Sequence, residues 1–176
     1  TVTNFPGGEQ PLEQVISETL FAIERGADEV DLVIPYKALV AGDERKVLEY
    51  VQASKDACGT QVQLKVIIES GELTNELIAT ATKLAIEGGA DFVKTSTGKV
   101  AVNATLAATK VILETIKASD KKVGFKAAGG VRTVTDAAEY LALAESIMGE
   151  AYLQPDIFRF GASGLLSDVY MILNES

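Results

Sequence analysis

The chain has 176 residues, 47% of them hydrophobic and 23% charged, which is typical of a globular domain with one sizeable core. Its formal net charge of −9 argues against nucleic acid as the main partner, because phosphate backbones need clustered Lys and Arg. The sequence contains no histidine, which excludes Ser-His and Cys-His triads, imidazole acid–base catalysis and histidine zinc ligands.

Short apolar runs rich in β-branched residues alternate with helical patterns along the chain. Strands are predicted at residues 1–5, 29–34, 61–68, 91–94, 122–126 and 157–160. Helices are predicted at residues 12–25, 43–57, 75–87, 106–118, 134–148 and 165–173. This alternation is typical of a parallel α/β sheet, and we expect one domain over residues 1–176.

Two helix–strand junctions are near copies of each other. Residues 26–31 read GADEVD and residues 89–94 read GADFVK, so Asp31 and Lys94 should occupy equivalent places near strand ends and point to the same side. A repeat of roughly 30 residues predicts either a (β/α) TIM-type barrel or an open doubly wound sheet. A full barrel has about eight βα units. We count six. We therefore expect an incomplete barrel, and interpret the start at Thr1, inside a strand, as a sign of truncation, of processing or of a partial sequence.

Lys94 ends an apolar strand and precedes a small, hydroxyl-rich loop, residues 95–98 (TSTG). Partial desolvation lowers the pKa of a lysine at such a position and frees a neutral amine that can attack a carbonyl. The alternative is a lysine that extends to solvent at a strand end.

Lys126 repeats this arrangement in the next unit. It ends the predicted strand and is followed by the glycine pair Gly129 and Gly130. Two inward lysines on neighbouring strands repel, so each should depress the pKa of the other. The glycine pair lets backbone N–H groups approach an anion at a helix N-terminus, unless it is only a tight turn.

Three buried charges are predicted on the other strands. Asp31 is costly in an apolar strand unless it pairs with Lys94 or Lys126, and it could then relay protons through water or act as a purely structural ion pair. We assign Lys65 and Glu69 to structural support of the site, and we expect Glu69 to hold a lysine in place.

Six segments together resemble class I deoxyribose-phosphate aldolase, over essentially the whole chain. They are residues 1–6 (TVTNFP), 27–31 (ADEVD), 64–73 (LKVIIESGEL), 92–104 (FVKTSTGKVAVNA), 123–133 (VGFKAAGGVRT) and 159–166 (RFGASGLL). The resemblance implies that Lys94 forms a Schiff base with the substrate aldehyde, that Lys126 tunes it, and that Asp31 is the acid–base partner through water.

The resemblance also implies the substrate and the phosphate end of the site. The family reversibly cleaves 2-deoxyribose 5-phosphate to glyceraldehyde 3-phosphate and acetaldehyde, without a metal or organic cofactor. The residues implied at the phosphate end are Gly98, Lys99, Gly129, Gly130, Gly161 and Ser163, with Thr97 nearby.

Three departures from the family pattern stand out. Ala127 replaces a proline after the second lysine, and Gly164 replaces a second serine of the phosphate loop. The two βα units that precede the first strand in the family, and supply one wall of its pocket, are missing.

Cys58 is the single cysteine, so no intrachain disulfide forms and a reducing, cytoplasmic location is expected. No apolar run is long enough to span a membrane. A homo-oligomer is expected, with a dimer across the open side of the barrel. Two alternatives stay open: an inactive or weakly active sugar-phosphate-binding fragment, and a transaldolase-like Schiff-base enzyme acting on a keto-sugar donor.

Overall fold

The computed structural model describes residues 1–161 and 163–175 and contains a six-stranded parallel sheet in which strand order follows chain order. An order without reversal is that of a barrel and not of a doubly wound sheet, which confirms the predicted fold class. In the part of the chain described, β1 and β6 are the two edges, and the sheet is not closed between them. The strands are β1 (Val2–Thr3), β2 (Glu29–Val33), β3 (Gln63–Ile67), β4 (Phe92–Lys94), β5 (Gly124–Ala128) and β6 (Phe158–Gly161).

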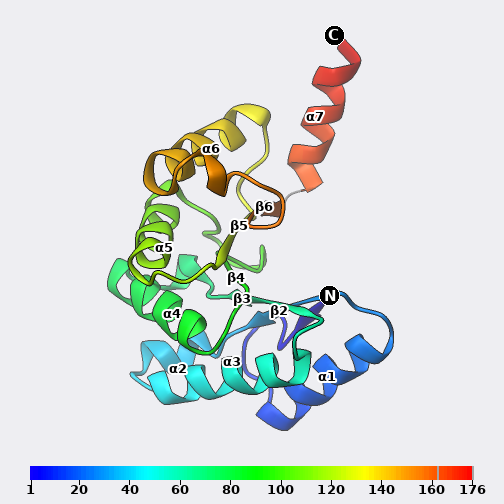
Figure 1. Ribbon diagram of the computed structural model, residues 1–176, viewed down its shortest axis with the longest axis vertical. Coiled ribbons are helices and arrows are strands. Elements are labelled where there is room, and N and C mark those ends of the chain that lie inside the picture. The colour runs from blue at the N-terminus through cyan, green and yellow to red at the C-terminus, as the bar shows by residue number, and fades with distance from the viewer. Residues whose placement is uncertain (162, 176) are drawn as a thin grey trace.

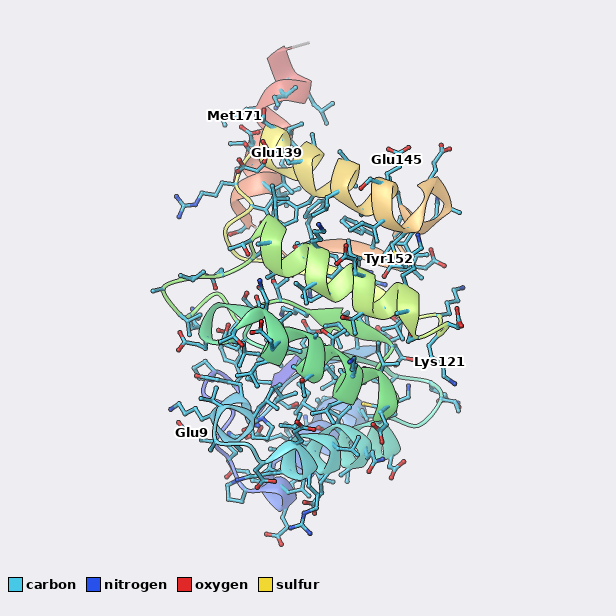
Figure 2. The ribbon with its side chains drawn as sticks, turned by 90° about the vertical axis from the view of Figure 1, so that its left-hand side faces the viewer. Glu9, Lys121, Glu139, Glu145, Tyr152 and Met171 are labelled. Carbon is cyan, nitrogen blue, oxygen red and sulfur yellow. The ribbon has the colours of Figure 1, made fainter. Side chains whose placement is uncertain are left out.

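The α-helices are α1 (Leu12–Glu24), α2 (Tyr36–Val40), α3 (Glu44–Cys58), α4 (Asn75–Glu87), α5 (Leu106–Ala118), α6 (Val134–Met148) and α7 (Ser163–Glu175). Helices α1 to α6 follow one another around the outside of the curved sheet, whereas α7 projects away from it (Figure 1). From the side, α3 to α6 stack one above the next, and each contacts its neighbour (Figure 2). Short 3₁₀ turns lie at Ser70–Glu72 and Glu150–Tyr152. No helix among the described residues is long and apolar enough to cross a membrane.

Threonine caps fix where three of the helices begin. Thr74, Thr105 and Thr133 each accept a hydrogen bond from a backbone N–H of the first helical turn, at 3.4, 3.1 and 3.0 Å. The side-chain oxygen thereby satisfies an N–H that the helix itself leaves unpaired. These caps account for the starts of α4, α5 and α6, whose predicted bounds agree with the structure at both ends.

The hydrophobic core lies between the sheet and the helices. Alternate strand residues such as Val30, Leu32, Val66, Val93 and Phe125 are buried there without solvent exposure. Because side chains alternate across a strand, the intervening residues share the opposite, inner face of the sheet. That inner face carries charged groups.

The structure corrects three sequence predictions. Strand β1 ends at Thr3 instead of residue 5, because Asn4 has a left-handed φ of 55°. Strand β5 extends to Ala128, which pairs with Gly161 on β6, so Lys126 lies in the middle of its strand and not at its end. Asp31 is likewise the third of five residues in β2. It lies on the same face as Lys94 but not at an equivalent level.

Gly124 allows the Phe92 ring to lie across the inner face of β5. A Cβ atom built on Gly124 would lie 2.4 Å from the ring of Phe92. We expect Gly124→Ala to lower the free energy of unfolding by about 1–3 kcal/mol through overpacking. Urea unfolding measures this effect, with Ser146→Ala on the exposed face of α6 as the control within about 0.5 kcal/mol of wild type. A Gly124 variant as stable as wild type would show that Phe92 can move away without cost.

Candidate active site

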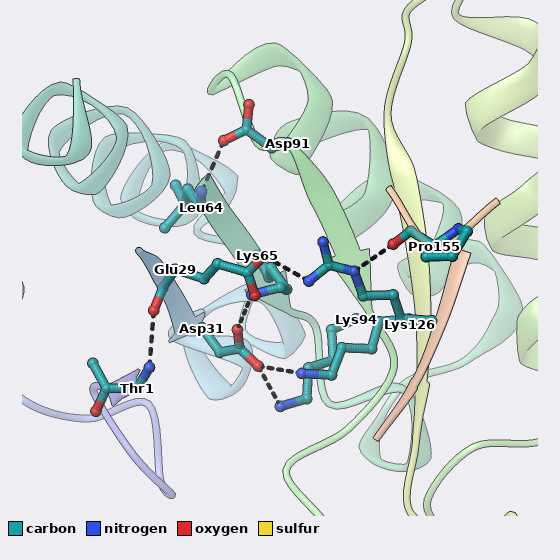
Figure 3. Close-up of polar contacts among 10 residues, drawn as sticks. Thr1, Glu29, Asp31, Leu64, Lys65, Asp91, Lys94, Lys126 and Pro155 are labelled. Carbon is teal, nitrogen blue, oxygen red and sulfur yellow. Dashed lines mark hydrogen bonds and ion pairs between the residues drawn. The ribbon is translucent and has the colours of Figure 1, made fainter. Parts of the chain in front are cut away.

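One carboxylate gathers three lysines on the inner face of the sheet (Figure 3). Asp31 Oδ1 accepts a hydrogen bond from Lys65 Nζ at 2.9 Å. Asp31 Oδ2 accepts from Lys94 Nζ at 2.7 Å and from Lys126 Nζ at 2.8 Å. The four residues come from β2, β3, β4 and β5, so this contact ties four consecutive strands together.

The strand register explains how these side chains meet. Asp31 is in register with Lys65, and Lys94 is in register with Lys126. Lys94 is also in register with Ile67, two positions beyond Lys65, so the pair Lys94–Lys126 lies one inner layer closer to the carboxyl ends of the strands. Their long side chains extend back to reach Asp31.

Glu29 and Arg159 form a second group of charges below this one. Glu29 binds Lys65 Nζ at 2.7 Å through one oxygen and Arg159 at 2.6 Å through the other. The Arg159 guanidinium lies 5.0 Å from the centroid of the Phe92 ring, which favours a cation–π contact. The Glu29–Arg159 pair joins β2 to β6 across the concave face, so it constrains the curvature of the sheet.

Burial and neighbouring charges shift the pKa values of Asp31 and Lys94. Burial alone would raise the pKa of Asp31, but the charge of Lys94 and hydrogen bonds from all three lysines hold it well below its usual range. Burial lowers the pKa of Lys94, the Asp31 carboxylate raises it, and the charges of Lys126 and Lys65 lower it again, with a lowered pKa as the result. Lys94 is 8% exposed, so its amine is largely removed from water.

A pocket of about 370 Å³ opens above these charges at the carboxyl ends of the strands. It is lined by Lys94, Thr97, Gly98, Ala128, Gly129, Gly130, Val131, Arg132, Gly161, Ser163 and Gly164. Gly129 and Gly130 have φ values of 72° and 84°, a left-handed conformation that brings the backbone close to the cavity. A larger hollow of about 690 Å³ lies at the amino ends of β4 and β5, which is the face where barrel enzymes do not carry out chemistry.

Nearly all the predicted site residues converge on this place. Lys94, Asp31 and Lys126 form the charged floor, and all but one of the residues predicted for the phosphate end line the pocket. The exception is Lys99, whose side chain is exposed and absent from the lining, and whose backbone N–H donates to Thr97 Oγ1. Ala162 lies outside the described residues.

Sequence reasoning missed two contributors and misassigned a third. Glu29 and Arg159 were not predicted to pair, because no sequence signal relates β2 to β6, although both have the parity of the inner face. Glu69 was expected to hold a lysine, but the hydrogen bonds to its carboxylate come from Thr97. In the described part of the chain, no cluster of three or more Cys, Asp or Glu side chains could hold a metal ion.

Comparison with known proteins agrees with this geometry. Residues 3–166 match the family model described as DeoC/LacD family aldolase. The chain is 56% identical over 174 residues to the deoxyribose-phosphate aldolase of Agrobacterium fabrum, an alignment that covers 98% of this chain and 67% of the relative.

Two solved structures share the fold over nearly the whole chain. A protein of Toxoplasma gondii assigned as a deoxyribose-phosphate aldolase, solved in its apo form, superposes with a TM-score of 0.92 at 28% identity, covering 100% of this chain and 71% of that one. A protein of Coccidioides immitis with the same assignment gives a TM-score of 0.86 at 28% identity, covering 98% and 63% of the two chains.

Asp31→Asn removes the charge that three lysines share. We expect the free energy of unfolding near neutral pH to fall by about 3 kcal/mol, because the lysines lose their buried partner. Since the folded state holds the pKa of Asp31 below its ordinary 3.8, the stabilisation is present above that pH and is lost as the pH falls below it.

Urea unfolding across this pH range tests the expectation, with the exposed Asp56→Asn as the matched control. The stability gap between Asp31→Asn and wild type should narrow as the solution is acidified below the ordinary carboxyl pKa. A gap that widens on acidification would contradict the assignment of Asp31 as the shared counter-ion.

Proposed function

The chain belongs to the DeoC/LacD family of aldolases, and we propose that it reversibly cleaves 2-deoxy-D-ribose 5-phosphate to D-glyceraldehyde 3-phosphate and acetaldehyde. The reaction proceeds through a Schiff base on Lys94. One observation carries the proposal: the buried Lys94 amine is bound to Asp31 at 2.7 Å and also lines a pocket large enough for a sugar phosphate.

Lys94 is suited to act as the nucleophile because its environment favours the neutral amine. Only an amine without its extra proton has the lone pair needed to attack a carbonyl. Burial and the charges of Lys126 and Lys65 lower the pKa of Lys94, while Asp31 limits how far it falls. Asp31 also keeps the amine oriented at the floor of the pocket.

The chemistry that follows balances without an external oxidant or reductant. The Lys94 amine adds to C1 of the open-chain sugar, and loss of water gives an iminium. Removal of the C3 hydroxyl proton then breaks the C2–C3 bond, and its electron pair moves towards the iminium nitrogen. This releases glyceraldehyde 3-phosphate and leaves an enamine. Protonation at C2 and addition of water release acetaldehyde and restore the amine.

Asp31 and Lys126 are the groups we assign to proton transfer, acting through a water molecule. Asp31 Oδ2 contacts both Lys94 and Lys126, so when one amine gives up a proton, the other amine can take one up beside the same carboxylate. The strongly depressed pKa of Asp31 keeps it ionised at neutral pH. Its main effect is therefore to stabilise the positively charged iminium, and in the proton transfer it acts as an ionised hydrogen-bond acceptor for the water molecule.

We assign the phosphate group of the substrate to the part of the pocket that is lined by the loops after β5 and β6. Gly129, Gly130 and Gly161 bring backbone there, and α7 begins at Ser163, so its N-terminus favours an anion. Arg132 adds a cation to the lining. Gly164 removes a hydroxyl donor relative to the family pattern, so phosphate affinity rests more on backbone groups.

Self-association stays a prediction. The outer edges of β1 and β6 are unpaired in the residues that the structure describes, and exposed strand edges favour pairing with a second copy. Helix α7 also exposes Leu166, Tyr170, Met171 and Leu173, at 55%, 59%, 57% and 67%. A surface of this kind is typical of a protein–protein contact.

Lys94→Ala should abolish cleavage of 2-deoxyribose 5-phosphate and also the trapping of substrate on the enzyme. Borohydride reduction in the presence of acetaldehyde should add one two-carbon unit to wild type at Lys94, because reduction converts the iminium into a stable amine. Turnover is followed by glyceraldehyde 3-phosphate release, and the adduct is located by peptide mass spectrometry.

Lys110→Ala is the matched control, because this exposed lysine on α5 lies away from the pocket and forms a loose ion pair with Glu114 at 3.9 Å. It should keep full turnover and the same adduct. Absence of any adduct in folded wild-type protein would refute the Schiff-base proposal. Binding of the sugar phosphate without turnover would favour the alternative of a sugar-phosphate-binding protein.

Lys126→Met should raise the pKa of Lys94, because it removes a neighbouring positive charge that lowers it. The acidic limb of the kcat/KM profile should therefore move to higher pH, together with a loss of kcat. Pre-steady-state trapping with acetaldehyde across the pH range measures the same shift directly. An acidic limb that stays in place or moves to lower pH would contradict this role of Lys126.

A further inference from the structure

Glu69 is the most fully buried acidic side chain among the described residues. It lies two residues after Ile67, the last residue of β3, and has no solvent exposure. Its backbone is left-handed, with φ and ψ of 55° and 56°, which is uncommon for a residue with a side chain. Such a conformation persists only where the surroundings hold it in place.

Both oxygens of the Glu69 carboxylate are occupied by one residue of the loop after β4. Oε1 accepts a hydrogen bond from the Thr97 backbone N–H at 3.1 Å, and Oε2 accepts one from the Thr97 hydroxyl at 2.5 Å. The Thr97 hydroxyl oxygen in turn accepts the Lys99 backbone N–H at 3.0 Å. Glu69, Thr97 and Lys99 thus form one chain of hydrogen bonds.

The two loops are also locked together through their backbones. The N–H of Ser70 donates to the carbonyl of Thr95 at 2.8 Å. A Cβ atom on Gly71 would lie 1.8 Å from the carbonyl oxygen of Val102, so only glycine fits there. The β3 loop is therefore a fixed support against which Glu69 holds the β4 loop.

This chain of hydrogen bonds fixes the direction of the Thr97 proton. A threonine hydroxyl has one proton and two lone pairs. The hydroxyl donates its proton to Glu69, and one of its lone pairs accepts the Lys99 N–H. The hydroxyl therefore has one lone pair left and can only accept a further hydrogen bond. A phosphate dianion offers acceptors and no donor, whereas a sugar hydroxyl can donate.

We propose that Glu69 is a positioning residue for the proposed aldolase reaction: its buried carboxylate orders the loop of residues 97–99 and leaves Thr97 as an acceptor for a substrate hydroxyl. Thr97 and the neighbouring Gly98 line the same pocket as Lys94. The inference rests on the proposed function for its substrate. It changes the expectation for Thr97, which serves the sugar hydroxyl and not the phosphate.

Glu69→Gln tests this with nearly no change in size. The amide oxygen can still accept the Thr97 N–H, but the amide NH₂ would oppose the hydroxyl proton and turn it away. We expect KM for 2-deoxyribose 5-phosphate to rise by up to about tenfold, which is the upper end of the effect of one lost hydrogen bond between uncharged groups. Borohydride trapping of acetaldehyde, which carries no hydroxyl, should stay within about twofold of wild type.

A double-mutant cycle with Thr97→Val shows whether Glu69 acts through Thr97. Glu69→Gln should have little further effect on KM in the Thr97→Val background, because the hydroxyl is already absent. Thr97→Ser, which keeps the hydroxyl, should have a KM close to that of wild type. Glu72→Gln, a neighbouring exposed acid, is the control for loss of one negative charge.

The outcomes separate this inference from the proposed function. A KM unchanged by Glu69→Gln, or effects of Glu69→Gln and Thr97→Val on KM that multiply independently, would overturn the role of Glu69.

If wild type shows neither turnover nor trapping, the proposed function fails, and amide hydrogen exchange then tests the role of Glu69. Exchange at the Lys99 amide should be faster in Glu69→Gln than in Glu72→Gln, because its acceptor, the Thr97 hydroxyl, is turned away. Equal rates would overturn the role of Glu69. If Glu69→Gln does not fold, Thr97→Val alone must still raise KM.

Discussion

The inner face of the sheet depends on the Asp31 carboxylate, which holds three ammonium groups within hydrogen-bonding distance. Buried lysines are costly unless a counter-charge compensates them. Glu29 shares this task by binding Lys65 and Arg159. Because this face is filled with charged side chains, the apolar core has to lie on the other face, between the strands and the helices.

The charges on this face do not cancel. Four basic side chains, Lys65, Lys94, Lys126 and Arg159, face two carboxylates, Asp31 and Glu29, so the local balance is positive when all are ionised. The whole chain has a net charge of −9. The sheet therefore creates a positive region inside an acidic protein, which is suited to the proposed sugar phosphate substrate. Burial lowers the pKa of Lys94, and the charges of Lys126 and Lys65 add to this effect against that of Asp31, so the neutral amine is favoured.

Two buried carboxyl groups have opposite environments in this fold. Asp31 faces lysines, which hold its pKa well below the usual range. Burial raises the pKa of Glu69, and the hydrogen bonds from Thr97 offset that effect only in part. Asp31 thus organises charge at the floor of the pocket, whereas Glu69 organises the loop at its wall. Divergent environments of this kind are common where one fold has to combine electrostatic support with positioning.

The sequence by itself determined the order and type of the main elements, because apolar periodicity and the glycine-containing junctions between helices and strands are local signals. It also predicted that Asp31 and Lys94 point to the same side, because the junctions at residues 26–31 and 89–94 are near copies, and that Lys126 repeats the arrangement of Lys94. Tertiary structure alone decided that a single carboxylate binds three lysines, that Glu29 reaches Arg159 across the sheet, and that Glu69 holds Thr97 and no lysine. These contacts join residues that are 28 to 130 positions apart in the chain. Their partners are set by strand register and sheet curvature, which no local pattern in the sequence encodes.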